Sequence, residues 1–191
     1  RAVLISVIGG WLLLPMAGYD FPLIPAFDKY MAISLGLLLG GYISGQRRFY
    51  NMKWSFCDVP MHLWCFNSLP TSISNGLGIY DGLSGTVEDF IRWGIPYMCG
   101  RIYFQDIDAL RDLCLGIVLG GLLYVPLCLF ELRMSPKLHY TFYGFFPHSF
   151  IQHVRYGGYR PIVFMQHGLM VSLWMACTSV ISFWLWRGSR W

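Results

Sequence analysis

Long runs of apolar residues, interrupted by few charges, constrain this chain more than any other feature of its sequence. The clearest runs cover residues 2–18, 30–45, 113–130 and 161–186. A helix that crosses the hydrocarbon core of a bilayer needs about 20 mostly apolar residues, and somewhat fewer when its flanking side chains snorkel. The four runs therefore predict four membrane-spanning helices.

Two further segments, residues 59–77 and 83–104, are less apolar, and the second carries Glu88, Asp89 and Arg92. Either both span the membrane as inward-facing helices, or they form an interfacial or re-entrant pair. Glu88 and Arg92 have the i,i+4 spacing of a helix ion pair, which would allow a polar helix to pack inside a bundle. With both segments counted, the fold class is all-α: a polytopic transmembrane helix bundle of about six spans.

Charged residues are scarce in this chain. Apolar residues make up 55% of it and charged residues 13%, whereas a soluble domain carries roughly 25% charged residues. A soluble domain of this length would need charged helix faces and loops at a density that this sequence lacks. The chain begins at Arg1 and ends in a cationic aromatic stretch, so we interpret it as an internal fragment of a longer protein. We expect residues 1–191 to form a single transmembrane domain.

The distribution of Lys and Arg between the predicted loops indicates an orientation, because cytoplasmic loops accumulate these cations. With the N-terminus inside, eight cations lie on the inner side: Arg1, Arg47, Arg48, Lys53, Arg101, Arg111, Arg187 and Arg190. Five lie on the outer side: Lys29, Arg133, Lys137, Arg155 and Arg160. The bias predicts an N-terminus inside. Four of the five outer cations fall in one predicted outer loop, residues 131–161.

This outer loop is the longest predicted loop, and its cations run against the orientation bias. Arg155 and Arg160 lie five residues apart around a flexible glycine pair, so the backbone can bend until both guanidiniums converge on one phosphate or pyrophosphate. The alternative is that the two arginines snorkel to lipid headgroups at the start of a helix. Glu131 and Arg133 flank the outer end of the preceding span, where they are candidate partners for the later arginines or for each other.

His167 lies seven residues beyond Arg160, inside the predicted span 161–186. An ionisable side chain within a membrane span is a candidate for catalysis or ligand contact. The alternative is a neutral histidine that is hydrogen-bonded to a neighbouring helix.

Several classes of site receive no support from the sequence. The six cysteines are scattered without CxxC spacing and are typical of buried small apolar residues. His148 and His153 lie five residues apart without a convincing third ligand, so we expect no metal site and no cofactor. The sequence contains no Walker loop, no GxGxxG and no serine hydrolase elbow, which excludes the common signatures of nucleotide hydrolysis and soluble hydrolase chemistry.

Glycines recur at spacings that favour helix packing. Gly36 and Gly40 form one small-xxx-small pair, and Gly116 and Gly120 form another. Such pairs allow helix backbones to approach closely inside a membrane. We therefore expect these positions to serve packing.

Three stretches together resemble the bacterial O-antigen ligase and O-antigen polymerase-like membrane proteins. They are WGIPYMCGRIYF at residues 93–104, FELRMSP at residues 130–136 and RYGGYRPIVFMQHGL at residues 155–169. The resemblance implies a polytopic glycosyltransferase of the bacterial inner membrane that uses no nucleotide sugar. Such a protein takes a glycan from an undecaprenyl-pyrophosphate carrier on the periplasmic side and passes it to a lipid A core sugar or a growing chain.

The family places arginines on the pyrophosphate and a histidine near the acceptor hydroxyl. Here Arg155 and Arg160, with Arg133, match the arginine role, and His167 is the candidate histidine. Members of the family usually have ten or more spans and a large periplasmic loop, which this chain does not contain. The implied partners are membrane lipids, the lipid-linked glycan and other membrane subunits, and no nucleic acid is expected.

A different class of function stays open. The chain is also consistent with a non-catalytic structural or accessory subunit of a larger membrane complex. In a variant of this hypothesis, His62 or His167 binds a pigment or haem.

Overall fold

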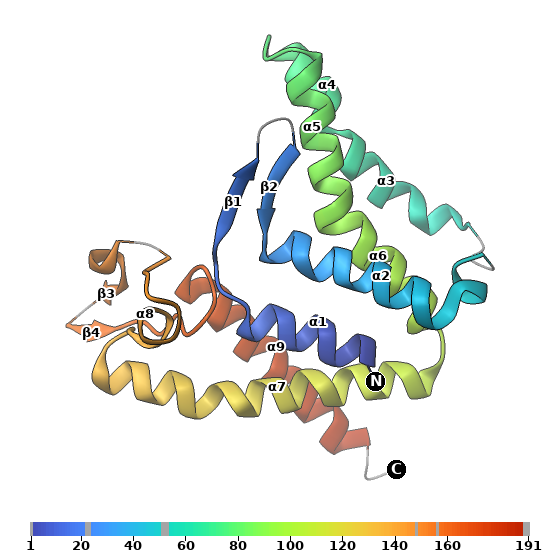
Figure 1. Cartoon of the computed structure of the whole chain (residues 1–191). Helices are drawn as coiled ribbons and strands as arrows, with labels where there is room; N and C mark the ends of the chain where they lie inside the picture. Colours follow the sequence, from blue (N-terminus) through green and yellow to red (C-terminus); the bar gives the residue numbers. More distant parts are fainter. Residues whose placement is uncertain (1, 22–23, 51–53, 148, 156, 189–191) are drawn as a thin grey trace. The chain divides into compact units, whose positions relative to one another are not determined.

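The computed structural model describes residues 2–21, 24–50, 54–147, 149–155 and 157–188, and it is mostly helical (Figure 1). The chain divides into two compact units. We call Arg1–Ala17 together with Leu110–Trp191 the terminal unit, and Gly18–Ala109 the middle unit. Each unit is described by itself.

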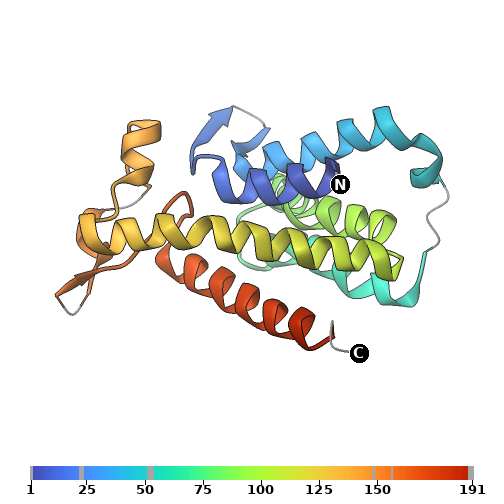
Figure 2. The same ribbon diagram turned by 90° about the horizontal axis from the view of Figure 1, so that it is seen from below.

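Three helices form the main body of the terminal unit: α1 (Ala2–Leu13), α7 (Ile107–Met134) and α9 (Gly168–Gly188). Both α1 and α9 lie along α7 (Figures 1 and 2). A Cβ atom at Gly120 would lie 2.7 Å from Leu12 Cδ1 and 3.2 Å from Trp174 Cζ2, so this glycine allows both helices to approach α7. A Cβ atom at Gly121 would overlap the Thr178 side chain.

These contacts confirm the packing role that the sequence predicts for Gly116 and Gly120, since a Cβ at Gly116 would lie 2.9 Å from Ile8 Cδ1. The same prediction is not confirmed for Gly36 and Gly40. In the described part of the chain, a Cβ atom at either of these positions meets nothing within 4 Å.

Between α7 and α9 the chain forms short elements. They are α8 (Leu138–Tyr143), the 3₁₀ turn η3 (Phe150–His153) and the paired strands β3 (Val154–Arg155) and β4 (Gly158–Tyr159). The segment that follows β4 returns to the core, where residues 162–165 are buried against Leu12, Tyr124 and Val171. This segment is not helical, and α9 begins only at Gly168.

The middle unit begins with an antiparallel hairpin and continues with helices. Its elements are β1 (Gly18–Phe21), β2 (Ile24–Asp28), α2 (Lys29–Tyr50), η1 (Phe56–Asp58), α3 (Val59–Phe66), α4 (Ser68–Ser74), α5 (Ile79–Asp89), the π turn η2 (Phe90–Gly94) and α6 (Ile95–Tyr103). The Asp28 carboxylate accepts a hydrogen bond from the Met31 amide at 2.9 Å, which caps the start of α2.

Helices α4 and α5 form a helical hairpin that turns at Gly76 and Gly78, both of which have positive φ angles. The helices approach closely where Gly82 faces Leu69 and Gly85 faces Ser68. The Ser68 hydroxyl donates a hydrogen bond to the Asp89 carboxylate across the hairpin. The hairpin therefore gives a hydrogen-bond partner to Asp89, one of the charged residues that made residues 83–104 ambiguous as a span.

Two helices in the described chain, α7 and α9, are long and apolar enough to cross a membrane. Only 22% and 17% of their apolar windows are buried, whereas the core helix of a soluble protein would be mostly buried. Membrane association is thus supported by length, composition and exposure. The prediction of about six spans is not confirmed. Helix α1 has 12 residues and rises only about 18 Å, less than the roughly 30 Å hydrocarbon core.

The predicted span 161–186 is wrong at its start. Residues 161–167 form an irregular turn, and the helix covers Gly168–Gly188. Pro161 does not begin a helix here, because the backbone at Val163 adopts a φ of 51° that helices do not allow.

Candidate functional site

A buried carboxylate organises the segment that connects α7 to α9. Glu131, in the last turn of α7, is fully buried. One of its oxygens, Oε2, accepts hydrogen bonds from the amides of Ile162 and Val163, each at 2.8 Å, and Oε1 accepts one from the Leu138 amide at 3.0 Å. We call this arrangement the Glu131 clasp.

The clasp supplies hydrogen-bond acceptors to backbone amides that are buried among apolar residues. Ile162 and Val163 are fully buried, and their backbone is not part of a helix or sheet. A buried amide without an acceptor costs about 1–3 kcal/mol. The Glu131 carboxylate supplies the acceptors that secondary structure would otherwise provide, and it links the start of α8 to the turn before α9.

The clasp supports neither of the two interpretations offered for Glu131, a pair with the later arginines or a pair with Arg133. The Glu131 carboxylate binds backbone amides and pairs with no arginine in the described part of the chain. Arg133 is exposed in the last turn of α7. Because α7 ends and α9 begins at this one connection, Arg133 and residues 160–167 belong to the same end of these two helices.

Arg160 lies directly before the clasped segment. Its amide donates a hydrogen bond to the His153 carbonyl at 2.8 Å, which extends the pairing of β3 with β4. The side-chain methylenes of Arg160 lie against Gly168, where a Cβ atom would overlap Arg160 Cγ and Cδ. Gly168 thus makes room for Arg160 at the first turn of α9, and the side chain is held half-buried.

His167 lies next to that contact. It directly precedes α9, its side chain is exposed, and its carbonyl accepts a hydrogen bond from the Met170 amide at 3.0 Å. The expectation that His167 lies inside the helix of a span at 161–186 is therefore wrong, because the residues between Arg160 and His167 do not form a helix. The irregular turn instead brings Arg160 against Gly168, the residue that follows His167.

Arg155 occupies β3, where its backbone is opposite Gly158. The next opposed pair is Val154 with Tyr159, and beyond it the Arg160 amide donates its hydrogen bond to the His153 carbonyl. The two arginines therefore lie on the two strands of one short hairpin, with Gly157 at a φ of 77° in its turn. The Arg155 side chain and His148 lie outside the described residues, so convergence of the two guanidiniums stays a prediction.

His139 connects two other parts of the terminal unit. The His139 ring is fully buried, and its Nε2 accepts a hydrogen bond from the Met16 amide at 3.2 Å. Its Nδ1 lies 2.9 Å from the Phe145 carbonyl. Since Nε2 accepts, the neutral tautomer with hydrogen on Nδ1 satisfies both contacts. His139 thus ties the chain after α1 to the segment after α8.

In the middle unit, charged groups are matched to one another. Arg92 contacts Asp28 at 2.6 Å and Glu88 at 3.0 Å, and its guanidinium lies over the ring of Tyr30. The i,i+4 pair predicted between Glu88 and Arg92 is confirmed. The second ion pair of Arg92, with Asp28 directly before α2, was not expected from the sequence.

A second polar cluster surrounds Asp58, which is buried. Its carboxylate accepts hydrogen bonds from the Tyr97 hydroxyl at 2.6 Å and the Ser55 amide at 2.8 Å, and Arg101 Nε lies 2.9 Å away. The hydrogen bond from Tyr97, then that from Ser55, and the Arg101 charge together hold the pKa of Asp58 below its ordinary value.

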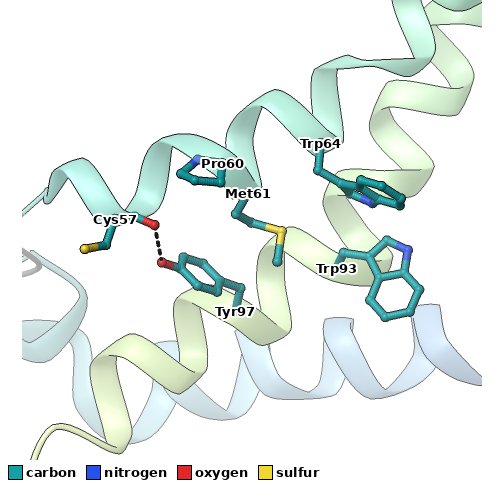
Figure 3. Close-up of a pocket in the computed structure, with 6 residues that line it drawn as sticks. All are labelled: Cys57, Pro60, Met61, Trp64, Trp93 and Tyr97. Atoms are coloured by element: carbon teal, nitrogen blue, oxygen red, sulfur yellow. Dashed lines mark hydrogen bonds between the residues drawn. The ribbon is translucent and has the colours of Figure 1, made fainter.

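A pocket of about 490 Å³ lies beside this cluster (Figure 3). It is lined by Cys57, Pro60, Met61, Trp64, Trp93 and Tyr97. The Tyr97 hydroxyl points toward Cys57, whose carbonyl it reaches at 3.3 Å, and the lining between the two tryptophans is apolar. The pocket offers a mostly apolar surface.

Within the described residues, no three His, Cys, Asp or Glu side chains gather as metal ligands. His62 is one of the two histidines predicted as alternatives for binding a pigment or haem. Its Nδ1 lies 2.7 Å from the Asp58 carbonyl oxygen. Cys65, Cys99 and Cys128 are buried, as the sequence indicates, whereas Cys57 and Cys177 are exposed.

Sequence reasoning missed the two residues that hold the connecting segment together, Glu131 and His139. A single carboxylate beside apolar residues carries no spacing signal that distinguishes an amide acceptor from an ion-pair partner.

The chain was compared with protein-family models, with curated proteins and with solved structures, and no match was found in any of the three.

Proposed function

We propose that this protein is a membrane glycan transferase of the O-antigen ligase type. It moves a glycan from an undecaprenyl-pyrophosphate carrier to an acceptor hydroxyl on the periplasmic side of a bacterial inner membrane. Arg160, with Arg155 and Arg133, binds the pyrophosphate, and His167 is the general base.

One observation carries the proposal: Arg160 is held against the first residue of α9, directly after His167. In the described part of the chain, no carboxylate pairs with Arg160 or Arg133. A cation that is packed against the first residue of α9 and a candidate base that directly precedes it thus both lie where an apolar helix begins. That is where a carrier lipid would present its pyrophosphate.

The reaction suits these groups. The bond between the anomeric carbon and the pyrophosphate oxygen breaks while the acceptor oxygen bonds to that carbon. The leaving pyrophosphate gains negative charge, which fixed guanidiniums stabilise. The acceptor hydroxyl loses its proton to His167, whose imidazole can accept it near neutral pH.

The test is surface polysaccharide in cells that carry Arg155→Ala, Arg160→Ala or His167→Ala in place of the natural residue. The proposal predicts loss of transferred glycan, with accumulation of the lipid-linked donor, in Arg160→Ala and His167→Ala. Lys137→Ala is the matched control, because Lys137 is also an exposed cation of the connecting segment. Unchanged glycan in all three variants, at normal protein level, would contradict the transferase and favour a non-catalytic subunit.

A further inference from the structure

We infer that Glu131 is a positioning residue for pyrophosphate binding: through the Ile162 and Val163 amides it fixes the turn that places Arg160. The inference deepens the proposed function and rests on it. Glu131 itself touches no substrate, because its carboxylate is fully buried and occupied by three amides.

The turn before α9 is held at its centre by the Glu131 carboxylate. Residues 160–167 lie between a strand of two residues and the start of α9. The turn contains Val163 at a φ of 51°, which is unfavourable for a β-branched residue unless surrounding contacts enforce it. The successive amides of Ile162 and Val163 donate hydrogen bonds to one Glu131 carboxylate oxygen, and the Met165 amide donates one to the Ile162 carbonyl; these bonds hold the backbone in that conformation.

Arg160 is linked to the clasp along the chain. Only Pro161 separates Arg160 from the clasped amide of Ile162, and proline fixes its own φ. The Arg160 side chain is held by its contact with Gly168, and its backbone amide is held by the hydrogen bond to the His153 carbonyl. Displacement of the Ile162 amide therefore moves the Arg160 backbone relative to α9.

The chemistry of the clasp favours an ionised carboxylate. An ionised carboxylate has acceptor sites for all three amides and requires no donor in return. Glutamine has nearly the same shape, but one of its two ends is an NH₂ group that faces an amide as donor against donor. Glu131→Gln therefore loosens the clasp without opening a cavity.

The experiment uses the full chain in membranes, with Glu131→Gln, with Glu88→Gln as the control at a half-exposed acid, and with Gly168→Ala. Three quantities are measured: hydrogen exchange of the segment containing Ile162 and Val163, modification of Arg160 by phenylglyoxal, and KM and kcat for an undecaprenyl-pyrophosphate-linked glycan. If Glu131→Gln does not accumulate, Glu131→Asp retains the charge and shortens the side chain by one methylene.

For Glu131→Gln we expect exchange to accelerate by about tenfold, the difference between a charged and a neutral acceptor. Arg160 modification should rise severalfold, and KM for the donor should rise more than kcat falls. Gly168→Ala should also raise KM for the donor, because the added Cβ overlaps Arg160 Cγ and Cδ. Its effect on exchange of Ile162 and Val163 should be smaller than that of Glu131→Gln, because the Cβ reaches only the Pro161 carbonyl, at 3.1 Å, and leaves the Glu131 carboxylate in place. Glu88→Gln should leave all three quantities unchanged.

Exchange and Arg160 modification equal to those of the unaltered protein would overturn the positioning role of Glu131, even if transfer activity is present. Absence of transfer by the unaltered protein would instead overturn the proposed function, while exchange and modification would still decide whether the clasp places Arg160. A loss of kcat alone, at unchanged Arg160 reactivity, would also contradict the inference.

Discussion

The connecting segment of the terminal unit and the helical part of the middle unit both place acidic side chains among apolar residues. The two regions give these carboxylates different partners. In the middle unit, Arg92 of η2 contacts Asp28 at the end of β2 and Glu88 of α5, so charges on neighbouring secondary-structure elements cancel each other. In the terminal unit, Glu131 binds backbone amides of an irregular segment. The first arrangement allows helices to pack, whereas the second fixes a shape that helix packing alone would not produce.

The difference matters for function, because fixed irregular backbone places side chains where regular helices cannot. The terminal unit leaves Arg133 and Arg160 without a carboxylate partner in the described chain, whereas the middle unit neutralises Arg92 and Arg101. Polar groups in the middle unit are thus explained by packing. The proposed function assigns Arg133 and Arg160 of the terminal unit to a ligand.

The largest expected effect comes from Glu131→Ala, which leaves three buried amides without their acceptor. We expect the free energy of unfolding to fall by about 3 kcal/mol or more, since each unsatisfied buried group costs about 1–3 kcal/mol. Denaturant unfolding in detergent micelles measures it. Glu88→Ala, in the middle unit, should cost well under 1 kcal/mol because its ion pair is half-exposed. Equal losses in the two variants would remove the contrast between the regions.

His139→Ala tests the second link of the connecting segment. It removes the acceptor of the Met16 amide and the donor to the Phe145 carbonyl, along with a buried ring. The expected loss is about 2–3 kcal/mol of unfolding free energy. Proteolysis between α1 and β1 should accelerate in parallel. A loss of less than about 0.5 kcal/mol would show that the segment is held without this histidine.

Gly121→Ala probes regular packing within the terminal unit. The added methyl group would overlap Thr178 on α9, so we expect a loss of about 1–3 kcal/mol from overpacking. Combining it with Thr178→Ala should recover part of the loss. Gly9→Ala is the matched control, because a Cβ atom at Gly9 meets nothing within 4 Å in the described chain. Thermal unfolding that ranks the two single variants equally would argue against close packing of α7 and α9.

Asp58→Asn gives the smallest effect and a distinct pH dependence. Because the folded state lowers the pKa of Asp58 below its ordinary value of 3.8, ionisation stabilises the fold at neutral pH. This contribution is lost as the pH falls from about 4 through the lowered value. Tryptophan fluorescence of Trp64 and Trp93 should follow the change. A stability difference between the two proteins that does not shrink as the pH falls below about 4 would contradict the assignment.

The sequence predicted the helical class, the apolar helices α7 and α9, the Glu88–Arg92 pair and the packing role of Gly116 and Gly120. Those features depend on local periodicity or short spacing. The start of α9 was mispredicted, since residues 161–167 are apolar like a span but are held in a turn by Glu131, a contact over 31 and 32 residues.

Of the candidate site, the sequence identified Arg160 and His167 but placed them two helical turns apart. The contact of the Arg160 side chain with Gly168 depends on the irregular turn, and the hydrophobicity of the sequence does not reveal that turn. The contact also depends on the absence of a side chain at Gly168, and no glycine spacing in the sequence indicates such a contact.

The most direct test of the account compares one arginine from each region in the same reaction. Unaltered protein, Arg160→Ala and Arg92→Ala are reconstituted in liposomes with a labelled undecaprenyl-pyrophosphate-linked glycan and a lipid A core acceptor, and transfer of label is measured. The account predicts that Arg160→Ala loses transfer by at least about a hundredfold, the effect of removing one charge-stabilising group, while Arg92→Ala retains most of it. Equal transfer by the two variants, or loss in Arg92→Ala alone, would contradict it.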